Sequence, residues 1–202
     1  MTGTTLTLLQ ALTNLSLAPA SPGLPSSWLL QRVPGVAAPL FSVTAEHTLR
    51  VAAVAAAGIA SYRLRAPLRP QPGTVSWRWR TATPLHDAVL RRHSAEAAPV
   101  RVVLAFADGR TLLYSWGERE SRGEHFPSPT GARRGVVVLE RAEDADGSWH
   151  LEQRDPFADY QVVFNRAPRA LVAAGVGADT QQVHGRTVAE VGELSWDGGA
   201  RP

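Results

Sequence analysis

The sequence contains no cysteine and no lysine. Without cysteine, the chain can form neither a disulfide framework nor a thiolate metal site, and the redox state of its compartment stays open. It also lacks any run approaching the roughly 18 consecutive apolar residues that a membrane-spanning helix requires. We therefore expect no transmembrane segment.

All 21 basic residues are arginine, and they are scattered along the chain among 18 acidic residues. Proteins that bind nucleic acid usually gather their basic residues on one helix or stripe, so this scatter predicts no nucleic-acid partner. The six histidines are isolated and lack the spacing of a zinc site. No phosphate-binding loop, dinucleotide fingerprint or nucleophile elbow occurs, and we expect no metal and no cofactor.

The length of 202 residues, with 44% apolar and 19% charged residues, predicts one well-filled domain. We expect this domain to span residues 25–197, followed by a tail at 198–202. Residues 1–24 are expected to form an extension that is poorly ordered or weakly signal-like. No basic residue precedes its apolar stretch, and Gln10 and Asn14 interrupt it, so the compartment stays unknown.

Ten short runs rich in β-branched and aromatic residues alternate with glycine and proline breaks. This pattern predicts an all-β fold, a jelly-roll-like antiparallel β-sandwich. One short helix is expected at 156–164, where Pro156 opens the segment and Asp155 can cap it. Two long loops, 83–99 and 117–134, are candidates for function or disorder. The predicted strands are 28–33, 48–54, 59–64, 74–81, 100–107, 111–116, 135–141, 149–154, 171–177 and 188–196.

The Asp-Gly pair at 108–109 lies between two apolar runs and predicts a tight two-residue hairpin. The resulting register puts Arg101 opposite Trp116 and Val103 opposite Tyr114. Because side chains alternate across a strand, these residues share one face, which we expect to be exposed. The other face, expected to lie in the core, carries Val100, Val102, Leu104, Phe106 and Leu113.

A second alternating run follows the same logic. Trp77 and Trp79 are expected to fill the core, while Arg78 and Arg80 emerge on the opposite surface. That surface is a candidate for the one that displays Tyr114 and Trp116.

Further motifs follow in a set order: Trp-Arg-Trp-Arg at 77–80, Arg-Val-Val-Leu-Ala-Phe at 101–106, Tyr-Ser-Trp-Gly at 114–117, Val-Val-Val-Leu-Glu at 136–140, Trp149 with Gln-Arg-Asp at 153–155, Asp-Tyr at 159–160 and Gly-Val-Gly-Ala-Asp-Thr at 175–180. Their order resembles DUF3047, a bacterial family of unknown function. The resemblance spans residues 25–197 and implies a jelly-roll-like fold. Family members often carry an export signal, which suggests the periplasm or cell envelope, and the family name implies no activity.

The chain departs from the family in two places. Family members usually carry an acidic stretch before the strand at 101–106, where this chain has only Glu96. After Asp179 and Thr180 they tend to have another Asp and an Asn, where this chain has two glutamines at 181–182. If the family binds calcium through such oxygens, of which calcium needs about six to eight, the resemblance implies a weakened site. Whether that site is lost or retained stays open.

Two charged positions each admit two interpretations. Arg154 either holds a substrate carboxylate or pairs with Asp155 at the start of the helix. Asp179 either serves a site or forms an Asx turn at a strand end.

Three functions are compatible with these residues. The first is a non-enzymatic module that recognises a saccharide or another polar cell-envelope ligand on one sheet face, since flat aromatic rings stack on sugars and arginine donates to hydroxyls or carboxylates. The second is a jelly-roll hydrolase or lyase acting on a glycan, with Asp179 beside Arg154 or Tyr114. The third is a protein-interaction module that uses the long loops, and the oligomeric state stays open. The candidate ligand-binding residues are Arg78, Arg101, Tyr114, Trp116, Arg154 and Asp179.

Overall fold

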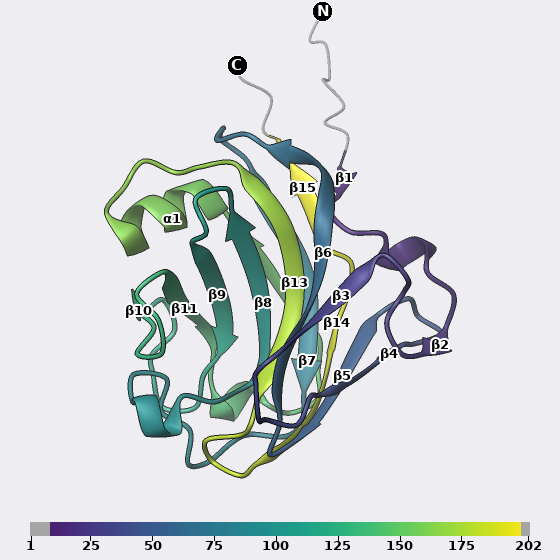
Figure 1. The fold of residues 1–202 in the computed structure, drawn as a ribbon, viewed down its shortest axis with the longest axis vertical. Helices are drawn as coiled ribbons and strands as arrows, with labels where there is room; N and C mark the ends of the chain where they lie inside the picture. Colours follow the sequence, from purple (N-terminus) through teal and green to yellow (C-terminus); the bar gives the residue numbers. More distant parts are fainter. Residues whose placement is uncertain (1–8, 199–202) are drawn as a thin grey trace, which may run out of the picture.

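The computed structural model describes residues 9–198, which form two β-sheets packed face to face (Figure 1). One sheet contains β1 (Gln10–Ala11), β2 (Ser21–Pro22), β4 (Leu40–Val43), β5 (Leu49–Val54), β7 (Thr74–Thr81), β12 (His150–Arg154), β14 (Arg186–Val191) and β15 (Ser195–Asp197). The other contains β3 (Trp28–Arg32), β6 (Ala57–Leu68), β8 (Ala98–Phe106), β9 (Thr111–Trp116), β10 (His125–Pro127), β11 (Arg134–Glu140) and β13 (Leu171–Asp179). The helices are α1 (Pro156–Phe164) and three short 3-10 turns, at Leu15–Leu17, His93–Ala95 and Ala142–Asp144.

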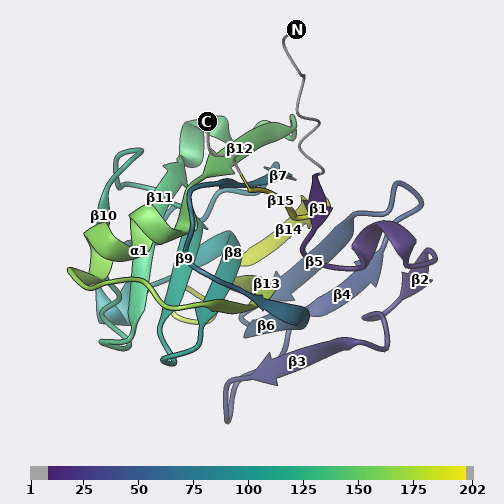
Figure 2. The ribbon, with the colours of Figure 1, turned by 90° about the horizontal axis from the view of Figure 1, so that it is seen from above.

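The eight-stranded sheet has the order β1-β15-β7-β14-β5-β4-β2, with β12 pairing additionally with β7. The seven-stranded sheet has the order β10-β11-β9-β8-β13-β6-β3. Within residues 9–198 the strand pairs are antiparallel, except that β11 runs parallel to β9. Helix α1 lies at one side of the sandwich, and β2, β3 and β4 lie at the other (Figures 1 and 2). The prediction of a β-sandwich with one short helix is confirmed.

The core is built from aromatic rings that both sheets contribute. Trp77 and Trp79 of β7 are buried, as predicted, because the strict alternation of this strand puts both rings on its inner face. Trp77 packs against Tyr114 with 5.2 Å between ring centres, and Trp79 packs against Trp116 at 5.5 Å. The two rings that were predicted to form an exposed platform therefore lie between the sheets.

The predicted register of the β8–β9 hairpin is wrong by one position. Arg101 pairs with Ser115, and the amide of Phe106 donates to the carbonyl of Arg110 at 2.9 Å. These bonds leave a three-residue loop in which Gly109 has φ +79°, a conformation that suits glycine. A shift of one residue turns every side chain of one strand to the other face. Strand β8 keeps its predicted faces, and β9 reverses them.

Helix α1 has the predicted bounds and the predicted cap. The carboxylate of Asp155 accepts hydrogen bonds from the backbone amides of Phe157 and Ala158, at 2.9 and 3.0 Å. The helix ends at Phe164 and is followed by Asn165, whose φ of 48° places it in the left-handed region.

The residues before position 25 contribute to the sandwich. Strand β1 pairs with β15 and β2 pairs with β4, while Leu12 and Leu15 are buried in the core. The sheet thus starts earlier than the predicted boundary, and the parts of the expected extension and tail at 1–8 and 199–202 lie outside the described residues. Strand β4 was not predicted, and the run 188–196 is split into β14 and β15. In the described part of the chain, no helix has the length and apolar character needed to cross a membrane.

Candidate functional site

The six predicted ligand-binding residues do not form one site. Arg78 lies on the outer face of the eight-stranded sheet, and Arg101 and Asp179 lie on the outer face of the seven-stranded sheet. Tyr114 and Arg154 meet beside α1. Trp116, the sixth, is enclosed between the sheets. Asp179 and Tyr114 therefore lie on opposite sides of one sheet and cannot contact the same substrate.

Tyr114 and Arg154 hold α1 against the sandwich. The hydroxyl of Tyr114 donates to Asp159 at 2.8 Å, and Arg154 donates through Nε to the same carboxylate at 2.9 Å. Burial, with the nearby Asp159 carboxylate, raises the pKa of Tyr114 well above its usual value. Arg154 thus pairs with Asp159 and not with Asp155, and its charge is neutralised within the fold.

Trp116 has no exposed surface, and its indole donates to the carbonyl of Arg141 at 2.7 Å. A ring without exposed area offers no stacking face to a ligand. The platform of Arg101, Tyr114 and Trp116 expected from the sequence does not exist.

Arg101 belongs to a buried polar cluster beneath the two long loops. Its guanidinium lies 3.3 Å from the carboxylate of Glu96, which also accepts hydrogen bonds from Ser128 and Thr130. Asp179 lies beside this cluster: burial raises its pKa, and the Arg101 charge opposes that effect. Its carboxylate accepts a hydrogen bond from the amide of Gln181 at 3.2 Å, as an Asx turn requires. The cluster thus connects both long loops to β8 of the seven-stranded sheet.

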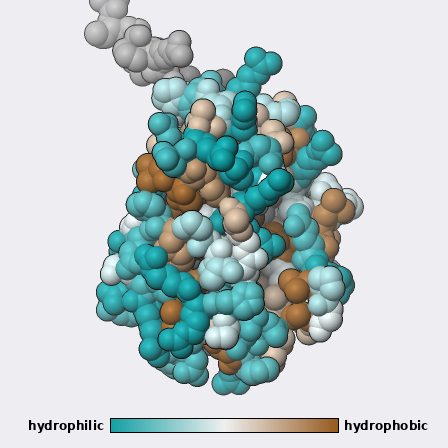
Figure 3. Space-filling model, turned by 60° about the vertical axis from the view of Figure 1, so that its left-hand side comes forward, coloured by the Kyte–Doolittle hydropathy of each residue, from teal (hydrophilic) through white to brown (hydrophobic). Residues whose placement is uncertain are grey.

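The surface over these loops is mostly hydrophilic. Figure 3, in which the side of α1 and β10 comes forward, shows hydrophobic residues there only in small, separated areas. An interaction module would be favoured by a continuous apolar patch beside the loops. This face gives that alternative no support.

A pair of carboxyls comes from different sheets, since Glu140 ends β11 and Glu152 lies in β12. Burial together with the nearby Glu140 carboxyl raises the pKa of Glu152 to about 7, and burial also raises the pKa of Glu140. His150 contacts Glu140 at 2.9 Å, and the guanidinium of Arg122 lies 2.6 Å from the same carboxylate. Because its pKa is raised, Glu152 holds its proton until the pH approaches about 7.

Arg78 is the one predicted ligand-binding residue that is exposed. Its guanidinium and that of Arg80 each lie 4.5 Å from the ring centre of Trp149, a cation–π distance. Arg80 donates to Glu190 at 3.1 Å, whereas Arg78 takes part in no ion pair within residues 9–198. Trp149 was not predicted as a site residue. The sequence offered one signal for Trp149, its position next to the strand that forms β12. Because β12 pairs with β7, the ring of Trp149 lies over the two arginines.

A hollow of about 430 Å³ adjoins Arg78 on this outer face. Its volume lies within the range of about 300–1,000 Å³ typical of small-ligand sites. It combines donors and acceptors with the apolar side chain of Leu151, which is 71% exposed. The polar side chains that line it, apart from Arg78, are those of Ser16, Glu46, His47, Thr48, Ser76, Gln153, Glu193 and Ser195. Such a surface can donate to hydroxyls and accept from them at several points.

Comparison with known proteins identifies the family of this chain. Residues 28–195 match the family described as "Protein of unknown function (DUF3047)", and no curated protein matches the sequence. Among solved structures, a family 11 carbohydrate-binding module from Clostridium thermocellum, in complex with a β-1,3-1,4-mixed-linked tetrasaccharide, is 9% identical with a TM-score of 0.48. That similarity covers 92% of this chain and 99% of the module.

Two further solved structures are similar over most of their length. A mutant of a family 29 carbohydrate-binding module is 7% identical with a TM-score of 0.47, covering 95% of this chain and 93% of that one. The xyloglucanase domain of a type three effector from Sinorhizobium fredii, in complex with cellobiose, is 12% identical with a TM-score of 0.45, covering 95% and 99%. Similarity at this level does not indicate what this chain binds.

Proposed function

This chain belongs to the DUF3047 family, and from that premise we propose that it is a non-enzymatic binding module for a saccharide or another polar cell-envelope ligand. The ligand lies on the outer face of the eight-stranded sheet, in the hollow beside Arg78. The family resemblance supports a location in the periplasm or cell envelope, where such ligands occur.

The observation that carries the proposal is the exposed guanidinium of Arg78 at the rim of a polar hollow, where it has no ion-pair partner among residues 9–198. Guanidinium presents fixed donors that match pairs of hydroxyl or carboxylate oxygens. Contact with the Trp149 ring limits the conformations of the arginine side chain, so less entropy is lost when a ligand binds. The apolar side chain of Leu151 can contact the carbon face of a sugar ring.

Isothermal titration against a panel of cell-envelope and plant glycans tests the proposal, with the wild type, Arg78→Ala and Arg63→Ala compared. Arg63 is a matched control because it is an exposed arginine of β6, on the other sheet, without an ion pair in the described part of the chain. A hydrogen bond from a charged donor contributes about 1.5–3 kcal/mol. We therefore expect Arg78→Ala to weaken binding by about 10-fold or more, and Arg63→Ala to leave it unchanged.

Thermal unfolding of the three proteins should give midpoints within about 4 °C of one another, because both arginines are exposed and the Arg78–Trp149 contact contributes only about 0.5–1 kcal/mol. Absence of binding to every glycan of the panel contradicts the proposal. Equal affinity of the wild type and Arg78→Ala would place the site elsewhere on the molecule.

A further inference from the structure

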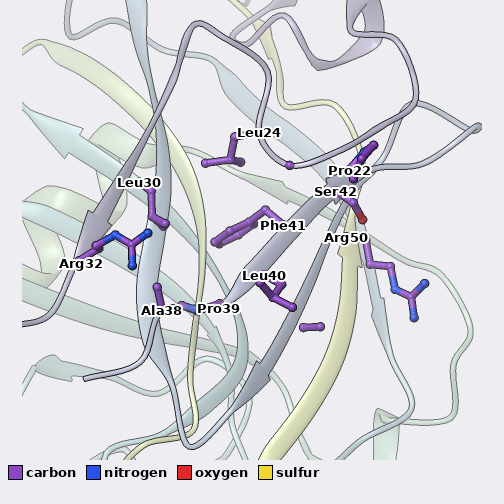
Figure 4. A pocket seen from close by; sticks show the side chains of 12 residues that line it. Pro22, Leu24, Leu30, Arg32, Ala38, Pro39, Leu40, Phe41, Ser42 and Arg50 are labelled. Carbon is purple, nitrogen blue, oxygen red and sulfur yellow. The ribbon is translucent and has the colours of Figure 1, made fainter. Parts of the chain in front are cut away.

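A second cavity opens on the side of the sandwich away from α1, between β3 of one sheet and β4 of the other (Figure 4). Its volume of about 780 Å³ exceeds that of the hollow beside Arg78 and suits a small ligand. The apolar side chains that define it are Leu24, Leu30, Pro39, Leu40 and Phe41.

The cavity exists because the two sheets are not closed at this edge. Strand β2 pairs with β4 only at Ser42 and Val43, so within residues 9–198 the first residues of β4 pair with β5 on one side and have no strand on the other. Phe41 points into the core, yet its ring borders the opening. Leu40 remains 77% exposed at the rim, so apolar surface continues from the core to the solvent. Covering that surface with a hydrocarbon would be favourable.

The charge around the cavity is of one sign. Arg32 and Arg50 line it from strands of different sheets, and its lining contains no aspartate or glutamate. Within residues 9–198 neither arginine forms an ion pair, and both are exposed. Figure 4 shows the guanidinium of Arg32 pointing toward the apolar side chains, whereas the side chain of Arg50 points outward. The two cations produce a positive potential at the mouth of an apolar cavity.

We infer that this cavity binds a long-chain carboxylic acid. The hydrocarbon chain lies along Leu24, Leu30 and Phe41, and the carboxylate pairs with Arg32. Guanidinium and carboxylate match in geometry and form two parallel hydrogen bonds. This inference goes beyond the proposed saccharide site, which lies elsewhere on the protein and uses Arg78.

Titration calorimetry with sodium laurate, sodium octanoate and 1-dodecanol, each below its aggregation concentration, tests the inference. Each methylene buried should strengthen binding about fourfold, so laurate should bind far more tightly than octanoate. Arg32→Gln should weaken laurate binding by about 10-fold or more and leave dodecanol binding unchanged. Arg63→Gln, which removes an equally exposed arginine from another surface, should change neither.

Several results would overturn the inference. They are no laurate binding by the wild type, equal affinity for laurate and dodecanol, or the same loss in Arg32→Gln and Arg63→Gln. Light scattering tests whether a second copy of the chain covers the cavity instead. A concentration-dependent dimer that Leu40→Ser abolishes would show that it does. Glycan titrations of Arg32→Gln separate the two proposals, because this variant should retain any saccharide binding that depends on Arg78.

Discussion

Replacing Glu152 by glutamine should change the pH dependence of stability. Burial and the nearby Glu140 carboxyl raise the pKa of Glu152 from 4.5 to about 7. The folded state therefore holds a proton that the unfolded state has released between these two pH values. Stability from this group is fully present below about pH 4.5 and is lost as the pH rises to about 7.

The magnitude follows from the shift and from the exposure of the group. At 1.36 kcal/mol per pKa unit the shift corresponds to at most about 3.4 kcal/mol. Glu152 is only partly buried, and solvent screening reduces this figure to about 1–2 kcal/mol. Glutamine cannot ionise, and its carbonyl can still accept the hydrogen bond that the Trp79 indole donates to Glu152 at 3.2 Å. Glu152→Gln should thus be about 1–2 kcal/mol more stable than the wild type at pH 8, and about equally stable at pH 4.

Urea unfolding followed by tryptophan fluorescence at pH 4, 5.5, 7 and 8 measures this difference. Glu143→Gln is the control, because the Glu143 side chain is 68% exposed and should show no comparable change. A difference between Glu152→Gln and wild type that stays constant across the pH range would refute the reasoning. So would a wild type that is more stable than the variant at pH 8.

Two further substitutions test the burial of Trp116 and Glu96. Trp116→Ala should lower the free energy of unfolding by about 3–5 kcal/mol, because it empties a fully buried site between the sheets; a loss below 1 kcal/mol in urea unfolding would contradict that placement. Glu96→Ala leaves the buried Arg101 without its ion-pair partner and should cost about 3–5 kcal/mol. It should also expose the loops at 83–97 and 117–134 to limited proteolysis. Glu96→Gln, which retains a hydrogen-bond acceptor, should lower the free energy of unfolding by less. Equal losses in the two variants would show that the charge of Glu96 is unimportant.

Local patterns determined much of the fold. The strands at 74–81 and 111–116 and the helix at 156–164 have the bounds predicted from the sequence. Alternation alone placed Trp77 and Trp79 in the core, because side chains of a strand point to opposite faces. The Asp155 cap could also be predicted, since a capping side chain bonds amides only two or three residues away.

The register of the β8–β9 hairpin could not be predicted from its own sequence. An Asp-Gly pair fits a two-residue turn, yet the loop has three residues. Asp108 accepts a hydrogen bond from the hydroxyl of Tyr160 at 2.6 Å, and Tyr160 lies on α1, far along the chain. The position of α1, together with the packing of Tyr114 and Trp116 against β7, decided the register.

The sequence by itself determined the fold class, the core positions of Trp77 and Trp79 and the exposure of Arg78, because each follows from neighbours in the chain. Only the tertiary structure decided which residues meet at a site. Trp149 reaches Arg78 through the pairing of β12 with β7, and Arg32 shares a cavity with Phe41 because β3 and β4 border the same open edge. The first contact joins strands that are far apart in the sequence, and the second joins consecutive strands that belong to different sheets. Neither pairing nor sheet membership can be read from the spacing of residues along the chain.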